Sequence, residues 1–384
     1  MNFASILARA RQAKNLSGKG LLAQAIEMAR LHRAPGKIGP SEYFDYGLFD
    51  DQRFDELAKQ EFIGWSRESF INNTFNKVEW GGLSLDKIVF YTFLEGAGIP
   101  YPRIQAIFDL HGRFIKEIPT FASPDTLATY LKNRDVYPIF VKPSHGNFGR
   151  GAHYLYAYNS RDESVVFANG AQSPLVDFIG SLETTLSGGQ IFQDVFQPHP
   201  DLAHRCGARS STMRVVVIMT RQGPQLCRAV WKIPTGSNII DNFQHGRTGN
   251  LLASVDVKTG DVYRVIGHGA DGEFTQISMH PDTGVDLMPL RIPDWAKAED
   301  LCLTAARLLP GLRLLHFDVA IANTGPLLLE VNFRGNLDLL QHASGKGFLS
   351  PEVSGALEDH AAFRQEIASI VQQTMREQQG SSGA

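Results

Sequence analysis

Residues 314–332 constrain the fold most, because they predict a β-hairpin with polar side chains gathered on one face. Two apolar runs flank an Asn-Thr-Gly sequence at 323–325 that is typical of a tight turn. If these three residues are the loop, Asp318 lies directly opposite Glu330, and Asn332 points the same way two residues further on. A loop one residue longer or shorter would place the two carboxylates on opposite faces.

Facing carboxylates repel each other unless one is protonated or a cation lies between them. Mg²⁺ accepts carboxylate and amide oxygens and leaves its other positions to water and phosphate oxygens. We therefore predict that Asp318, Glu330 and Asn332 are metal ligands. The alternative is an edge hairpin whose polar face simply meets solvent.

The composition is that of a globular protein without an obvious charged partner. The chain has 384 residues, enough for two or three packed lobes, with 43% hydrophobic and 20% charged residues. The net charge of −3 does not suggest a nucleic-acid binder, and no apolar run approaches the roughly 20 residues that span a bilayer. Three scattered cysteines without CxxC spacing predict a reducing, cytoplasmic location, with no disulfide scaffold and no zinc site: Cys206, Cys227 and Cys302.

The first 82 residues predict a helical region with glycine and proline between its helices. Residues 1–26 carry four basic residues and no acid, as a transit peptide would, but their apolar spacing equally suits an ordinary helix, which we favour. The predicted helices are 3–14, 20–33, 40–47, 51–60 and 63–76.

From residue 83 onward, helices and strands alternate without a regular βαβ cycle, which indicates an α+β fold. A helix at 83–96 has Ser84 as its predicted cap. Further predicted helices lie at 124–132, 294–309 and 355–377, before a polar tail. The predicted strands, apart from the hairpin, are 103–108, 113–117, 138–142, 152–158, 190–196, 211–219, 225–233, 250–257 and 261–267.

A glycine-rich loop at 142–151 lies between two of these strands. Glycine lets successive backbone N–H groups approach an anion, so the loop is a candidate phosphate-binding nest. Its spacing matches neither a P-loop nor a dinucleotide-binding turn, and a glycine-rich hairpin alone is a weak signal. Its candidate phosphate contacts are Lys142, Ser144, Gly146, Asn147 and Gly149.

The order of these motifs resembles the ATP-grasp superfamily, and several stretches resemble its sugar-transfer-associated branch. The branch stretches are 197–202, 211–214, 240–243, 280–284 and 325–327. The superfamily motifs are Asp86-Lys87, Gly98-Ile99-Pro100-Tyr101-Pro102, Val141-Lys142-Pro143, Ile191-Phe192-Gln193-Asp194, Arg214 and the Asp318 and Glu330-Val331-Asn332 pair.

The resemblance implies an ATP-grasp fold, in which two α+β lobes clasp a nucleotide. We expect a core at 83–343, with a smaller nucleotide-clasping lobe at about 138–196. The helical region at 1–82 precedes it, and a C-terminal helix with a polar tail at 344–384 follows.

The resemblance also implies roles for single residues. Lys87 and Lys142 would reach the phosphates of ATP, and Arg214, assisted by Lys232, would contact the transferred phosphoryl group. Asp201 is a candidate for the ribose hydroxyls. The hinge against adenine would be Gln193, Asp194, Val195 and Phe196.

A polar, glycine-rich segment at 235–249 interrupts the predicted strands. It is either a lid over phosphates and acceptor or a disordered excursion. Its candidate contacts are Asn238, Asp241, Asn242 and Arg247. His316, two residues before Asp318, receives no role, because a lone strand histidine is more often structural.

These features predict an ATP-dependent ligase that activates a carboxylate as an acyl phosphate, releases ADP and joins the acyl group to an amine. The expected cofactors are ATP and two Mg²⁺ ions, for which Mn²⁺ would substitute. The partners would be small molecules, such as an amino acid or amino sugar, without nucleic acid or membrane; a homodimer is compatible. The alternatives are a phosphotransferase on the same scaffold and a non-catalytic nucleotide-binding partner of a sugar-transfer system.

Overall fold

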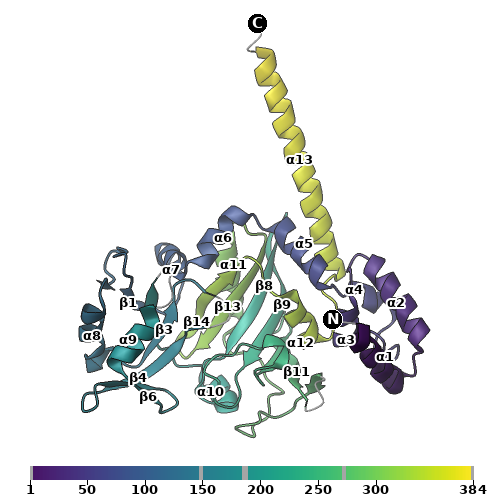
Figure 1. The fold of residues 1–384 in the computed structure, drawn as a ribbon. Coiled ribbons are helices and arrows are strands. Elements are labelled where there is room, and N and C mark those ends of the chain that lie inside the picture. Colours follow the sequence, from purple (N-terminus) through teal and green to yellow (C-terminus); the bar gives the residue numbers. More distant parts are fainter. Residues whose placement is uncertain (1–2, 147–149, 184–188, 270–273, 382–384) are drawn as a thin grey trace.

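The structure, a computed structural model, describes residues 3–146, 150–183, 189–269 and 274–381 (Figure 1). Two seven-stranded sheets form the body, and helices cover their faces. Helices α1 to α4 pack at one end of the molecule, and the first sheet forms the other end. This mixture of two predominantly antiparallel sheets and helices is the α+β architecture that the sequence predicted.

The first sheet is antiparallel except for its β1–β2 pair. Helices α8 (Pro124–Leu131) and α9 (Leu175–Glu183) bury their apolar faces in the core beside it. The sheet includes strands at 104–108 and 120–121, so it extends beyond the lobe predicted at about 138–196. In spatial order its strands are β2 (Thr120–Phe121), β1 (Ile104–Phe108), β7 (Gln190–Asp194), β3 (Ile139–Pro143), β4 (His153–Asn159), β5 (Ser164–Phe167) and β6 (Gln172–Pro174).

The second sheet is antiparallel throughout. Helix α11 (Trp295–Arg307) packs on it with an apolar stripe that includes Ala298, Cys302 and Ala305, and α12 (Leu337–Ser344) packs in a separate core beside β9 to β11. Its strands, in spatial order, are β12 (Phe274–Gln276), β11 (Val262–His268), β10 (Leu251–Val255), β9 (Gly223–Ile233), β8 (Thr212–Thr220), β13 (Leu314–Ala322) and β14 (Gly325–Asn332).

The N-terminal helices share a small aromatic core around Tyr43, Phe44 and Phe62. Within it, Lys59 Nζ lies 2.8 Å from the carboxylate of Glu27, so the buried charges are paired. The helices that contribute to this core are α1 (Phe3–Ser17), α2 (Leu21–Arg33), α3 (Pro40–Asp45) and α4 (Glu56–Glu61). Helix α5 (Trp65–Phe75) packs instead in the core that holds α12.

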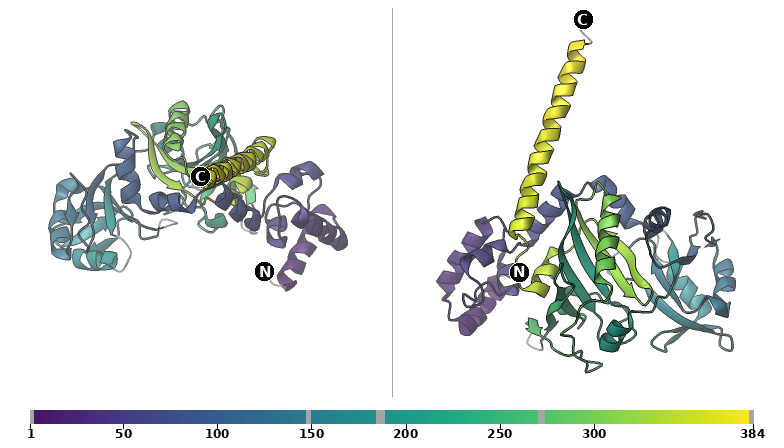
Figure 2. Two further views of the ribbon diagram at one scale, coloured as in Figure 1. Left: turned by 90° about the horizontal axis from the view of Figure 1, so that it is seen from above. Right: turned by 180° about the vertical axis from the view of Figure 1, so that it is seen from behind.

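The C-terminal helix α13 (Pro351–Ser381) projects away from the body, as Figure 1 and the right panel of Figure 2 show. It continues through most of the predicted polar tail. The chain also forms a short helix α10 (Pro200–Cys206) and two single-turn 3₁₀ helices, at Arg134–Val136 and Gln244–Gly246. Across the described ranges, every helix is either too short or too polar to cross a bilayer.

Two local predictions were wrong. The helix expected at 83–96 is interrupted, giving α6 (Val78–Leu85) and α7 (Lys87–Gly96). Asp86 caps α7 by accepting from the backbone N–H of Ile88 at 2.9 Å, whereas Ser84 donates to a carbonyl within α6. The strand expected at 113–117 is reduced to one isolated bridge that involves Ile115.

Candidate active site

The β13–β14 hairpin brings the predicted metal ligands together, although its turn differs from the prediction. Ala322 pairs with Gly325, so the loop has two residues and not three. A bulge at Leu329 adds one residue to β14 and restores the predicted pairing of Asp318 with Glu330. The turn prediction was therefore wrong, and the predicted register at the carboxylates is confirmed.

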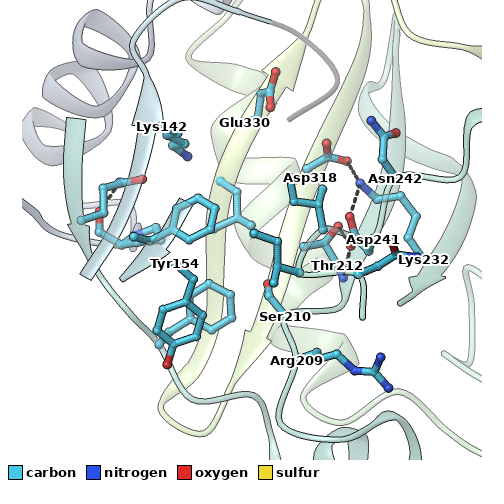
Figure 3. A pocket seen from close by; sticks show the side chains of 18 of the residues that line it. Lys142, Tyr154, Arg209, Ser210, Thr212, Lys232, Asp241, Asn242, Asp318 and Glu330 are labelled. Carbon is cyan, nitrogen blue, oxygen red and sulfur yellow. Dashed lines mark hydrogen bonds and ion pairs between the residues drawn. The ribbon is translucent and has the colours of Figure 1, made fainter. Parts of the chain in front are cut away.

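Asp318 lies in a network of buried charges. Its two oxygens accept from Arg214 Nε at 2.6 Å and Nη2 at 3.0 Å, across the pairing of β13 with β8. Lys232 Nζ lies 3.4 Å from Asp318 and 3.4 Å from Asp241, and Asp241 accepts from the backbone N–H and hydroxyl of Thr212 (Figure 3). This network holds five side chains in fixed positions on one wall.

Burial alone would raise the pKa of Asp318, but the Arg214 guanidinium and the Lys232 ammonium hold it below its usual value. For Asp241 the balance is reversed: burial raises its pKa, and Lys232 and Thr212 offset only part of that effect. The Asp318 carboxylate is therefore ionised at neutral pH and is available to a cation.

Two lysines approach from the opposite side. Lys142, on β3, donates to the Tyr91 hydroxyl at 2.9 Å, and that hydroxyl donates to the carbonyl of the bulge residue Leu329 at 2.6 Å. Lys87 donates from Nζ to the carbonyl of Gly146 at 2.9 Å. Burial lowers the pKa of Lys142 to about 8, against the opposing effect of Glu330, and burial likewise lowers the pKa of Lys87.

A cavity of about 1070 Å³ lies between the two sheets, and Lys142 and the charged network around Asp318 both line it. Lys142 borders it on one side, and Asp318 and Glu330 face it from the other (Figure 3). The cavity is also lined by further predicted contacts: Gln193, Asp194, Val195, Phe196, Arg214, Lys232, Asn238, Asp241, Asn242 and Asn332.

Other predicted contacts do not reach the cavity wall. Asp201 lies on α10 with its carboxylate exposed, 3.8 Å from His199, and is not among the lining residues. Ser144 is buried against His145, and Gly146 serves Lys87 through its carbonyl. Lys87 and Arg247 are likewise absent from the lining. Asn147 and Gly149 lie outside the described residues.

The 235–249 segment is held in place by hydrogen bonds to the buried Asn250. The Asn250 amide donates to the carbonyls of Ile240 and Asn242 and accepts from Asn238. These bonds favour a shaped cavity wall over a disordered excursion, because they satisfy backbone carbonyls that would otherwise need water.

Several lining or supporting residues were not predicted. Tyr91 follows Lys87 by four residues on α7, so the two lie on the same helix face, and this spacing was the available signal. Arg209 and Arg334 line the cavity without a recognisable motif. His316 pairs with Asn332 on the ladder, and neither of its ring nitrogens has a partner among the described residues. Burial lowers the pKa of His316 to about 3, so its ring is neutral.

Aromatic residues line the cavity near the segment that was predicted to be the hinge, residues 193–196. Phe140 and Tyr154 line it beside Phe196, and these flat surfaces suit a planar base. Asp194 is held by Arg103 at 2.8 Å and Gln105 at 2.7 Å, which anchors the end of β7. The predicted hinge is thus anchored beside the aromatic lining of the cavity.

Comparison with known proteins places the chain in a family. The sugar-transfer associated ATP-grasp family matches residues 67–354, which is most of the chain. No curated protein is similar enough in sequence to count as a match.

Solved structures show only distant similarity. D-alanine-D-alanine ligase from Coxiella burnetii is 11% identical with a TM-score of 0.42, over 78% of this chain and 64% of that one. ATP-grasp ligase PsnB, solved with a precursor variant, Mg and ADP, is 14% identical with a TM-score of 0.39, over 74% and 61%. This chain thus spans less than two thirds of either protein. From the family match, the chain belongs to the sugar-transfer associated ATP-grasp family.

Proposed function

We propose that the protein is an ATP-dependent ligase that forms an acyl phosphate from a carboxylate and transfers the acyl group to an amine. The observation that carries this proposal is the distribution of charge across one cavity. Lys142 lies on the wall of the first sheet, and Asp318 and Glu330 lie on the wall of the second. At about 1070 Å³, the cavity is at the upper end of the roughly 300–1000 Å³ typical of ligand sites, which suits a nucleotide and a second substrate.

The residues present fit Mg²⁺. Asp318, Glu330 and Asn332 offer carboxylate and amide oxygens on one wall, which are the donors that this ion prefers. Bound there, Mg²⁺ would neutralise charge on the ATP phosphates. Because Asp318 is already ionised in its ion pair with Arg214, no proton need leave it before a cation binds.

The chain's own side chains would orient the reactants. Lys142, which is held by its hydrogen bond to Tyr91, would bind a phosphate oxygen. Two of the five N–H groups of Arg214 are used by Asp318, so the others remain for an oxygen of the substrate carboxylate or phosphoryl group. Lys232 adds a second positive charge on the same wall. Holding both reactants in this way lowers the entropic part of the barrier.

The reaction needs no covalent intermediate on the protein, and the lining agrees with that. Among the described residues that line the cavity there is no cysteine and no histidine. The described cysteines are also poor nucleophiles, since burial raises the pKa of Cys227 to about 12 and that of Cys206 and Cys302 as well. Exclusion of water would protect the acyl phosphate from hydrolysis.

The test is to incubate the purified protein with ATP, Mg²⁺ and pools of carboxylates and amines, and to measure ADP. We expect ADP release that requires one carboxylate and one amine together. With a carboxylate carrying a heavy oxygen isotope, one labelled oxygen should appear in the released phosphate, because the acyl phosphate transfers it. A stable phosphorylated acceptor without label in free phosphate would instead identify a phosphotransferase, and nucleotide binding without any turnover would identify a non-catalytic partner.

Two cavity variants and two matched controls complete the test. Lys142→Ala and Glu330→Gln should each lose turnover while remaining folded. Lys132→Ala removes a lysine that is exposed and paired with Glu163, and Asp300→Asn changes an exposed acid on α11, so both should keep full activity. Full activity in both cavity variants would show that the site lies elsewhere.

A further inference from the structure

A second group of potential ligands lies outside the proposed catalytic machinery. The side chains of His245, Asp338 and His342 place one ligand atom each within 4.8 Å of the others. Nδ1 of His245 already lies 3.2 Å from an oxygen of Asp338. Asp338 and His342 are four residues apart on α12, so they share one helix face, and His245 reaches them from the 235–249 segment.

The surroundings hold two of these three side chains in place. The ring of His342 lies 4.8 Å from that of Tyr46 and 4.6 Å from that of Phe274, measured between centroids. Asp338 is the second residue of α12, and its carboxylate accepts from the backbone N–H of Leu339 at 2.7 Å. His245, by contrast, is exposed, so an ion from solvent has access and this ring is free to adjust.

The charges at the two ends of α12 differ. The carboxylates of Glu68 and Asp338 lie together at its N-terminal end. At the C-terminal end of α12, Arg264 donates a hydrogen bond to the backbone carbonyl of His342. The guanidinium of Arg53 also interacts electrostatically with the His342 ring. The arginines oppose a cation next to His342, whereas the carboxylate of Asp338, 3.2 Å from His245, favours one on its own side.

The ligand chemistry distinguishes this group from the magnesium site. Two imidazole nitrogens and one carboxylate oxygen are typical of Zn²⁺ and related transition metals, whereas Mg²⁺ takes oxygen ligands almost exclusively. Metal–ligand distances of about 2.0–2.2 Å in a tetrahedral site separate ligand atoms by roughly 3.4 Å. The His245–Asp338 pair already meets that separation. Rotation of the exposed His245 side chain would bring its ring closer to that of His342.

We propose that His245, Asp338 and His342 form a binding site for a zinc-class divalent metal, which fastens the 235–249 segment to α12. The sequence predicted no zinc site, because that prediction rested on cysteines alone. A metal here would also stiffen the cavity wall. Asn242 lies three residues before His245, and Leu339 follows Asp338; both line the cavity. This proposal does not depend on the ligase reaction.

The test is a titration of the tag-free, chelator-treated full chain with Co²⁺, followed by visible absorption, and with Zn²⁺, followed by calorimetry. Saturating Mg²⁺ is present throughout to fill oxygen sites. We expect one equivalent to bind, with the intense absorption of four-coordinate cobalt. His245→Gln and Asp338→Asn should each weaken binding by more than about tenfold, since even supporting partners of metal ligands contribute that much.

Three further measurements keep the result interpretable. His111→Gln alters an exposed histidine just after β1 and should leave metal binding unchanged. Glu330→Gln in the cavity should also leave it unchanged. Metal-free unfolding curves verify that each variant folds. In limited proteolysis, Zn²⁺ should slow cleavage within 235–249 in the wild type but not in His245→Gln.

The proposal is overturned by any of three outcomes: no stoichiometric binding, binding that His245→Gln leaves intact, or binding lost in Glu330→Gln alone. The last would place the ion in the catalytic cavity. All of these readouts are independent of turnover, so failure of the proposed function would leave them unaffected.

Discussion

Nucleotide binding is predicted to depend on pH through the amine of Lys142. In the nucleotide-free protein, burial lowers the pKa of this amine to about 8, and Glu330 and Asp318 offset only part of that effect. A phosphate in contact with the ammonium would restore its pKa toward the ordinary value of about 10.4. Above pH 8, binding must therefore be accompanied by proton uptake, and the apparent affinity falls as the pH rises.

The size of the effect follows from the fraction of Lys142 that is protonated before binding. With a pKa of about 8, that fraction is about 0.9 at about pH 7 and about 0.09 at about pH 9. The apparent affinity should thus be about tenfold weaker at the higher pH, which corresponds to about 1.4 kcal/mol.

The assay is calorimetric titration with a non-hydrolysable ATP analogue and Mg²⁺, in buffers of different ionisation enthalpy, so that bound protons are counted directly. Lys142→Arg is the matched control, because a guanidinium remains charged throughout this range and its profile should be flat. Burial also lowers the pKa of Lys87, so Lys87→Arg separates that contribution. Equal affinity at both pH values without proton uptake, or the same slope in Lys142→Arg, would refute the reasoning.

Three further changes have expected outcomes. Lys142→Met should raise the free energy of unfolding of the nucleotide-free protein at about pH 7 by up to about 3 kcal/mol, measured by urea unfolding. The pKa of Lys142 is lower in the folded protein than in the unfolded chain, so the cost of burying its charge is complete below about pH 8 and fades as the pH rises to about 10.5. An unchanged unfolding midpoint would contradict this prediction. Asp318→Asn leaves the charge of Arg214 buried without its partner and should lower stability by about 3–5 kcal/mol, seen as a lower midpoint. Gly335→Ala should destabilise by more than about 1 kcal/mol, because its new methyl would lie 2.1 Å from the ring of His316; His316→Ala in the same chain should recover much of the loss, and additive effects would argue against the contact.

The hairpin shows how far local pattern carries a prediction. Alternation of apolar and polar residues places Glu330 and Asn332 on one face, since side chains alternate along any strand. It does not reveal the bulge at Leu329, because one inserted residue leaves no clear mark in the sequence pattern. Whether a strand bulges depends on what it packs against. Here the carbonyl of Leu329 accepts from Tyr91, a residue from a helix far away in the chain.

The site shows where local pattern stops. The resemblance implied that Asp201 contacts ribose, yet helix α10 carries its carboxylate to an exposed position away from the cavity. Arg214 was expected to face a phosphoryl group, and the structure adds its ion pair with Asp318. The Arg214–Asp318 contact joins residues 104 positions apart, which spacing along a chain does not encode.

The sequence by itself contains the order of motifs, the alternation along each strand and the identity of the polar side chains. These properties sufficed to predict an α+β fold with carboxylates facing each other on one hairpin. Only the tertiary structure decided which of these groups border one cavity, which are buried in ion pairs, and how far their pKa values move. The physical reason is that hydrogen bonding and strand alternation act between near neighbours, whereas burial and electrostatic interaction depend on how the two sheets pack around the space between them.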